Sequence, residues 1–152
     1  MKRVLLLLTL AAATSASALD FPLSGFQIKA LDVAKGSTPT SPLVMCLPPS
    51  DGFAPNVNVT IQPFPGTLGD YITVSKDEFA QVKWNVVAES RPDDKTWTVE
   101  YADPSPENPL HFYARAVTSG KYVYLVTATA KESQWKTVES QLRQCVDSFK
   151  AK

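Results

Sequence analysis

The residues of this chain that could do chemistry are few and fall on three neighbouring predicted strands. On alternation alone, Glu89 and Glu100 lie on the first two strands, and His111 and Arg115 share one face of the third. If the register aligns these faces, the four side chains form one polar cluster. It could hold a small anion on Arg115, use His111 in acid–base catalysis, or serve as a cross-strand ion pair that stabilises the sheet.

Other catalytic and metal sites need residues that this sequence does not supply. His111 is the only histidine, no G-x-S-x-G motif occurs, and the glycines are not grouped as in a phosphate-binding loop. A structural zinc site takes four Cys or His ligands. The acidic residues at 92–94 and 103–107 do not follow a calcium-loop pattern. We therefore expect no catalytic residues, no metal and no cofactor.

The N-terminus has the three parts of a secretory signal peptide. Lys2 and Arg3 precede an apolar run over residues 4–13, and Ala16-Ser17-Ala18 is an A-x-A cleavage pattern. The run is shorter than the roughly 20 residues of a membrane span, and no lipid-acceptor cysteine follows it. We expect cleavage after Ala18 and a secreted or periplasmic single domain, residues 19–152, without a lipid or transmembrane anchor.

The charge of the chain bears on its partners. Lys and Arg equal Asp and Glu at 15 each, and both signs are scattered without a basic run. Nucleic acid and anionic lipid both require a concentrated positive patch. We therefore expect neither as a partner.

Cys46 and Cys145 are the only cysteines. An even number in an exported chain favours a disulfide, and two buried free thiols are the alternative. A bridge closing a loop of about 100 residues could stabilise the fold by up to about 4–5 kcal/mol in the chain-entropy model. We expect the disulfide Cys46–Cys145.

The stretch from residue 56 to residue 62 alternates valine or isoleucine with asparagine or threonine. This alternation predicts a half-buried strand whose apolar face meets the core. Prolines on both sides favour an edge position. Asn58-Val59-Thr60 is also a glycosylation sequon, which matters only in a host that modifies exported chains.

The remaining elements follow from hydrophobic periodicity. Strands are predicted over residues 43–47, 56–62, 84–91, 96–102, 110–118 and 121–128, with a further short one near 27–31. Helical spacing predicts a helix over 67–82, in which Thr67 and Asp70 form a weak capping box. A second box, Thr129 with Glu132, predicts a final helix that ends near Lys150. Whether residues 21–32 join the sheet is left open.

The run YVYLVTATA at 122–130 is apolar on both faces of its strand. A strand with water on one side should alternate, so this strand is expected to be covered on both sides. Two amphipathic helices are available to cover it. The sequence therefore predicts an α+β fold, an antiparallel sheet of five or six strands with helices packed on both faces.

The order of elements and three phrases resemble the PsbP-like and DcrB-like group of small α/β/α sandwich proteins. The phrases are FAPNVNV at 53–59, YVYLVTATA at 122–130 and DSF at 147–149. The resemblance implies the PsbP-like fold and a non-enzymatic module that binds or steadies a partner protein. It brings no catalytic set, and the chain departs from the many lipoproteins of the DcrB-like group because it has no lipid-acceptor cysteine.

We therefore expect an exported accessory module that binds another exported or envelope protein. A carrier of a small ligand is the alternative, with a pocket between the sheet and a helix and with Arg115 or His111 orienting a polar group. A small hydrolase-like enzyme comes third, because no nucleophile is placed beside a base.

Overall fold

The computed structural model describes residues 18–21, 26–29 and 40–151. The chain divides into two units, residues 1–35 and 36–152. In the first unit, β1 (Ala18–Phe21) pairs antiparallel with β2 (Phe26–Lys29), and these two strands form a sheet of their own. The predicted leader residues 1–17 lie outside the described residues, and Ala18, at the predicted cleavage point, is the first residue of β1.

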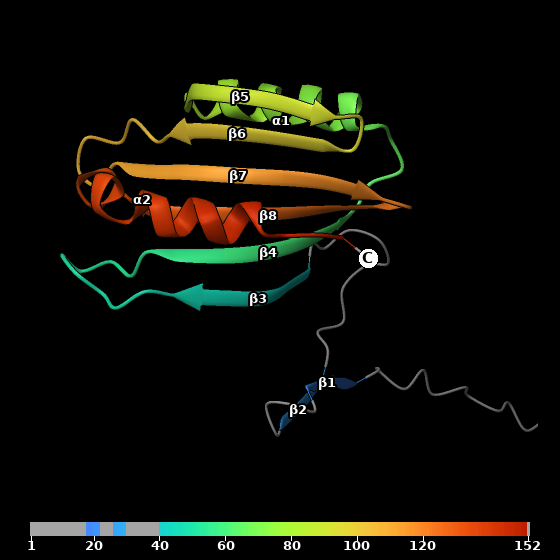
Figure 1. Cartoon of the computed structure of the whole chain (residues 1–152), viewed down its shortest axis with the longest axis horizontal. Coiled ribbons are helices and arrows are strands. Elements are labelled where there is room, and N and C mark those ends of the chain that lie inside the picture. Colours follow the sequence, from blue (N-terminus) through green and yellow to red (C-terminus); the bar gives the residue numbers. More distant parts are fainter. Residues whose placement is uncertain (1–17, 22–25, 30–39, 152) are drawn as a thin grey trace, which may run out of the picture. The chain divides into compact units, whose positions relative to one another are not determined.

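The second unit contains a six-stranded sheet in the order β3-β4-β8-β7-β6-β5, in which every neighbouring pair is antiparallel (Figure 1). Its strands are β3 (Thr40–Cys46), β4 (Asn56–Pro63), β5 (Asn85–Asp93), β6 (Thr96–Ala102), β7 (Leu110–Ser119) and β8 (Tyr122–Lys131). Two helices, α1 (Leu68–Gln81) and α2 (Glu132–Asp147), complete the unit.

The two helices lie on opposite faces of this sheet (Figure 1). Helix α1 packs on β5 and β6, whereas α2 packs mainly on β8, β7 and β4. On the α1 side, a core cluster includes Trp97 and Tyr101. On the α2 side, a second cluster includes Val57 and Trp135. The predicted α+β fold with a helix on each face is confirmed.

Strand β8 is covered on both faces, as its sequence predicts. Val123 is fully buried in the cluster on the α1 side, while Val126 and Ala128 belong to the cluster on the α2 side. Because β8 lies between β4 and β7, its backbone is also paired along both edges. The central position of β8 explains why its sequence does not alternate.

The start of α1 is as predicted. Thr67 is the N-cap: the Asp70 N–H donates to Thr67 Oγ1 at 3.2 Å, and the Thr67 N–H donates to Asp70 Oδ2 at 2.8 Å. This reciprocal pair satisfies two backbone donors that a helix terminus otherwise leaves free.

The start of α2 differs from the prediction. Thr129 belongs to β8, where it pairs with Phe112 of β7 and with Asn56 of β4. The helix begins at Glu132, and the Lys131 N–H donates to Gln134 Oε1 at 3.1 Å. Pairing on both sides keeps Thr129 in the strand, and pairing with β7 extends β8 to Lys131, so Thr129 does not cap the helix.

Strand β4 is not an edge strand, contrary to the prediction. It lies between β3 and β8, and the edges of the sheet are β3 and β5. Val57 and Val59 are buried on the α2 side, and Asn58, which faces the other way, is half-buried. The sequon therefore lies inside a strand that is paired on both sides. The prolines bracket β4 without marking an edge, because β3 pairs beside it.

Cys46 and Cys145 are both free thiols, so the predicted disulfide is not formed. Cys46 pairs with Asn56 across β3 and β4, and Asn56 adjoins Val57, which faces α2. Because successive strand residues point to opposite faces, Cys46 faces the α1 side. Cys145 lies on α2 and packs against the cluster on the other face. The sheet separates the two residues.

Candidate functional site

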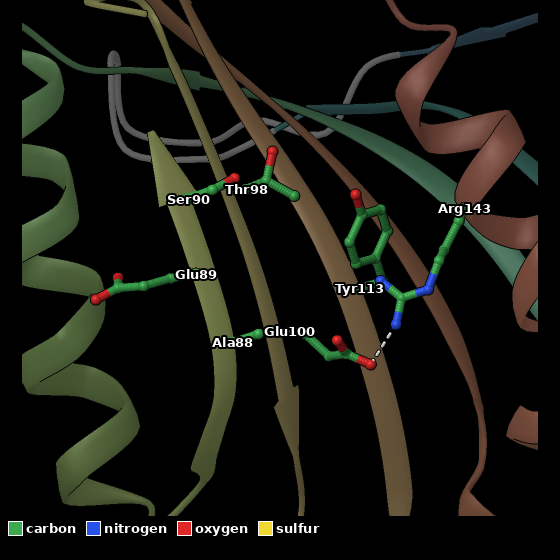
Figure 2. Close-up of a pocket in the computed structure, with 7 residues that line it drawn as sticks. All are labelled: Ala88, Glu89, Ser90, Thr98, Glu100, Tyr113 and Arg143. Atoms are coloured by element: carbon green, nitrogen blue, oxygen red, sulfur yellow. Dashed lines mark hydrogen bonds and ion pairs between the residues drawn. The ribbon is translucent and has the colours of Figure 1, made fainter. Parts of the chain in front are cut away.

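A polar groove lies beside α2, on the face of the sheet that this helix covers (Figure 2). Its volume is about 140 Å³, and it is lined by Ala88, Glu89, Ser90, Thr98, Glu100, Tyr113 and Arg143. Helix α2 packs mainly on β8, β7 and β4. The neighbouring strands β6 and β5 form the floor of the groove. The predicted polar cluster is found here in part.

Glu100 is the centre of this polar cluster. Its Oε1 atom lies 2.8 Å from Nε2 of His111 and 2.5 Å from Nη2 of Arg143. The Glu100 side chain is only 13% exposed. One largely buried carboxylate therefore joins β6, β7 and α2, and charge-assisted hydrogen bonds of this kind are among the stronger ones in proteins.

His111 is buried and both of its ring nitrogens are engaged. The residue is 6% exposed, and Nδ1 lies 2.8 Å from Oε2 of Glu132. The imidazole also stacks on Trp135, with ring centroids 4.1 Å apart. A neutral imidazole has a single N–H, so both contacts are hydrogen bonds only when the ring or one carboxyl carries an extra proton. Neither nitrogen is free to take a proton from a substrate.

Arg143 lies between the groove and the aromatic residues beneath α2. Its guanidinium carbon is 4.4 Å from the ring centroid of Tyr113 and 5.5 Å from that of Trp135. Its Nε lies 3.7 Å from Glu139 on the same helix. The cation is thus held by two aromatic faces and two carboxylates, Glu100 included, which fixes its position at the groove wall.

Arg115 shares the face of His111 but lies further along β7. Its Nη1 is 3.8 Å from Oδ1 of Asp147, and its buried Nε has no hydrogen-bond partner among the described residues. The Tyr113 hydroxyl donates to the same Asp147 oxygen at 3.0 Å. Burial, followed by the hydrogen bond to Asp147, raises the pKa of Tyr113. Arg115 and His111 therefore belong to separate ion pairs at the two ends of α2.

Glu89 does not join the cluster, although alternation grouped it with the other three residues. It pairs with Val99 and points to the α1 side, where it accepts hydrogen bonds from Nε1 of Trp97 at 3.1 Å and from Nζ of Lys76 at 2.6 Å. The Lys76 ammonium lowers the pKa of the Glu89 carboxyl. A bulge between Val86 and Ala88 shifts the alternation of β5 and turns Glu89 to this face.

The sequence patterns did not predict that three further residues belong to this network. They are Glu132, Trp135 and Arg143, which all lie on α2. Their spacing of three and eight residues places them along one face of a helix, which is the signal that could have found them. Polar residues that flank the apolar face of a helix lie at the border of its packing surface. In α2, Glu132 and Arg143 lie at this border and contact His111 of β7 and Glu100 of β6.

Residues 18–21, 26–29 and 40–151 contain no group of three or more His, Cys, Asp or Glu side chains that could hold a metal ion. None of the helices described in these ranges is long and apolar enough to span a membrane.

Comparison with known proteins gives a family and several similar structures, of which two are described. A family model described as PsbP matches residues 64–151. The fold resembles the crystal structure of PA94, a protein of unknown function from Pseudomonas aeruginosa, with a TM-score of 0.66 and 10% identity over 90% of this chain and 96% of that one. It also resembles the solution structure of cyanobacterial PsbP (CyanoP) from Synechocystis sp. PCC 6803, with a TM-score of 0.53 and 17% identity over 97% of this chain and 99% of that one.

No curated protein matches the chain. At these identities the two solved structures establish a shared fold, whereas the family model spans the chain from the end of β4 through α2. The match includes both helices and four of the six strands of the large sheet. The chain belongs to the PsbP family.

Proposed function

We propose that this chain is a non-enzymatic accessory module that binds another exported or envelope protein along the free edge of β3. The observation that supports this most directly is the exposure of consecutive aliphatic side chains on that edge. Leu43, Val44 and Met45 are 44%, 57% and 43% exposed. In the described residues β3 pairs with β4 alone, so its other edge can accept an extended segment of a partner by strand addition.

The two edges of the sheet differ in how well they suit strand addition. Strand β5 carries two irregularities, and Pro92 and the charged residues Arg91 and Asp93 lie on it. Bulges, proline and charge are the features that discourage pairing at an edge. Strand β3 has one register shift, between Thr40 and Leu43, and Pro42 lies there, whereas from Leu43 to Cys46 it keeps a regular register with β4. The β3 edge is therefore the better template for a partner strand.

Side chains on both faces of β3 contribute to this surface. Leu43 and Met45 pair with Val59 and Val57 and so face the α2 side, whereas Val44 faces the α1 side. A partner strand laid along β3 would cover apolar side chains on each face. Exposed apolar edges favour self-association, and an occupied binding surface is one way a protein removes that hazard.

The polar groove supports a role without catalysis. Both nitrogens of His111 contact carboxylates, and the ring is covered by Trp135. A general base needs a nitrogen within hydrogen-bond reach of the substrate proton, and His111 offers none. The network instead fastens α2 to the sheet. Export is supported by the signal-peptide pattern of the N-terminus.

A site-specific photo-cross-linker tests the proposal. The residue p-benzoylphenylalanine would replace Val44 in the full chain, expressed in its native host, and Val74 would be the matched control because it is 48% exposed on α1. We expect position 44 to cross-link to one other protein and position 74 not to do so. In a separate variant, Val44→Lys should abolish the complex.

Three outcomes would overturn the proposal. They are no adduct at position 44, equal adducts at both positions, and an adduct formed only with a second copy of the chain.

A further inference from the structure

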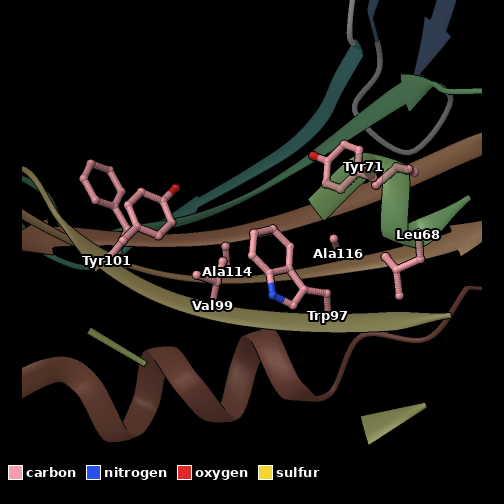
Figure 3. Packing of buried hydrophobic residues seen from close by; sticks show 9 residues of the cluster. Leu68, Tyr71, Trp97, Val99, Tyr101, Ala114 and Ala116 are labelled. Carbon is pink, nitrogen blue, oxygen red and sulfur yellow. The ribbon is translucent and has the colours of Figure 1, made fainter. Parts of the chain in front are cut away.

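A cavity of about 160 Å³ lies between α1 and the sheet, on the face opposite the polar groove. It is lined by Gln62, Tyr71, Ser75, Glu78, Phe79, Trp84, Trp97, Val99, Tyr101, Ala114 and Leu125. Figure 3 shows Val99 and Ala114 between Trp97 and Tyr101 on this face of the sheet, and Tyr71 on α1. A carrier pocket between sheet and helix was expected to use Arg115 or His111, but neither lines this cavity.

The cavity exists because small residues lie among large ones. The buried positions of α1 are Leu68, Tyr71 and Ser75, and Ser75 has the smallest side chain of the three. Ala114 on β7 is 1% exposed and lines the same cavity. Where a serine and an alanine occur between aromatic neighbours, the surrounding side chains leave unfilled volume, because packed cores relax only partly around missing atoms.

Stacked aromatic rings form the wall of the cavity. The ring of Tyr101 stacks on Phe79 with centroids 4.5 Å apart and on Trp84 with centroids 5.2 Å apart. Phe79 also stacks on Trp97 at 6.4 Å. Because each ring is held by its neighbours, the wall is formed before any ligand enters, and little ordering of side chains would be needed on binding.

The polar lining residues of the cavity come mainly from α1, and Gln62 of β4 adds an amide. Tyr71 and Ser75 are buried, and Glu78 on the next turn of α1 is exposed. Burial is the main cause that raises the pKa of Tyr71 to about 12; the Glu78 carboxylate acts in the same direction, and hydrogen bonds with Ser75 and Gln62 act against it. The phenol is thus a neutral donor or acceptor inside the cavity. Glu78 is the one charged residue among the described lining residues.

We infer that this cavity binds a small organic cation of about the size of an alkylammonium group. The Glu78 carboxylate would attract a cation through its opposite charge, and the oxygens of Tyr71 and Ser75 can accept hydrogen bonds inside the cavity. An anion would meet Glu78 with no positive lining residue to offset it. An apolar cavity of about 150 Å³ holds a benzene-sized molecule, so the volume limits the ligand to a few heavy atoms.

Choline and its neutral isostere 3,3-dimethyl-1-butanol test the charge preference. Trp84 and Trp97 line the cavity, whereas Trp135 belongs to the other face, so tryptophan fluorescence of the full chain would report binding. We expect a saturable change with choline and an affinity for the isostere that is weaker by about 3-fold or more. Equal affinities would show that the cavity binds apolar groups without a preference for charge, which contradicts the proposal. The absence of a saturable response to choline would show that the cavity does not bind it.

Two variants separate charge from shape. Glu78→Gln keeps the size of the side chain, and we expect it to weaken choline binding by about 3- to 10-fold. Asp77→Asn, which changes the neighbouring exposed residue of α1, is the matched control and should leave the affinity unchanged. Ser75→Leu fills the cavity and should abolish binding. If Glu78→Gln binds choline as the wild type does, the assignment is wrong, even where Ser75→Leu fails to fold.

This site is independent of partner binding at β3. Val44 does not line the cavity, so Val44→Lys should leave the choline response unchanged. The failure of either proposal would therefore be visible without affecting the other.

Discussion

Glu100 and His111 lie on adjacent strands with their side chains 2.8 Å apart, although they are not direct cross-strand partners. Glu100 is paired with Tyr113, and His111 is paired with Ala102, so the contact runs diagonally across the sheet. The same carboxylate oxygen binds Arg143 of α2. A single side chain thus links β6 and β7 to α2.

Glu100→Gln should destabilise the fold markedly. The amide keeps the size of the side chain, but it leaves His111 and Arg143 without their shared carboxylate in a largely buried position. Removing one partner of such a network costs about 2–4 kcal/mol. The expected result is a fall of that size in the free energy of unfolding, measured by urea denaturation at neutral pH.

Glu132→Gln is the matched comparison for this prediction. Glu132 contacts the other nitrogen of His111, but its side chain is 50% exposed. Solvent screens such a pair, and its loss should cost less than about 1 kcal/mol. Equal losses for the two variants would show that the buried carboxylate has no special role.

Tyr71 should make the fold sensitive to alkaline pH. Burial raises its pKa from 10.0 to about 12, so the folded state holds the phenolic proton more tightly than the unfolded chain does. The stability from this difference is complete below about pH 10 and is lost as the pH rises toward about 12. Tyr71→Phe should flatten the decline in this range, as followed by urea unfolding and by tyrosinate absorbance.

Tyr122→Phe serves as the control for this titration, since Tyr122 is exposed at the start of β8. If both variants decline with pH in the same way as the wild type, the buried phenol does not govern the alkaline limit.

The elements were predictable from the sequence because each is encoded by a local period. The strand predicted over residues 96–102 matches β6, and Thr67 with Asp70 marks the start of α1. The double cover of β8 followed from its apolar run. The period of two residues in strands and of about four in helices can be recognised within one segment. Predicting these elements therefore requires no knowledge of the elements that pack beside them.

The candidate site was less predictable because it depends on register and on strand order. The bulge before Ala88 turns Glu89 away from Glu100, and a change of one residue reverses every side chain that follows. Strand order places β3, and with it Cys46, at the edge, whereas the flanking prolines had favoured an edge position for β4. The cavity beneath Ser75 depends on Ala114, which is far away in the sequence.

Thr67→Ala should weaken α1. The substitution removes the hydroxyl that accepts from the Asp70 N–H at 3.2 Å and that donates to the Asp70 carboxylate at 2.7 Å. Loss of an N-cap of this kind costs about 1 kcal/mol. We expect that decrease in the free energy of unfolding and a small loss of helical circular dichroism. Thr67→Ser keeps the hydroxyl and should retain most of the stability, and a serine variant as weak as the alanine one would argue against capping.

Cys46→Ser should leave stability almost unchanged. The two thiols are free and lie on opposite sides of the sheet, and Cys46 is exposed. Replacing an exposed thiol that forms no disulfide changes the free energy of unfolding by less than about 0.5 kcal/mol. A native disulfide would instead cost about 2–5 kcal/mol when removed. Urea denaturation of both forms separates these two cases.

Thiol labelling completes the same prediction. In the folded protein, Cys46 should react quickly with a thiol reagent and half-buried Cys145 more slowly, because access limits the rate. After denaturation both should react at similar rates. Two results together would show a disulfide: an intact mass short by two hydrogens, and no labelling until a reductant is added. Because the sheet separates Cys46 and Cys145, such a bridge would require the fold to rearrange.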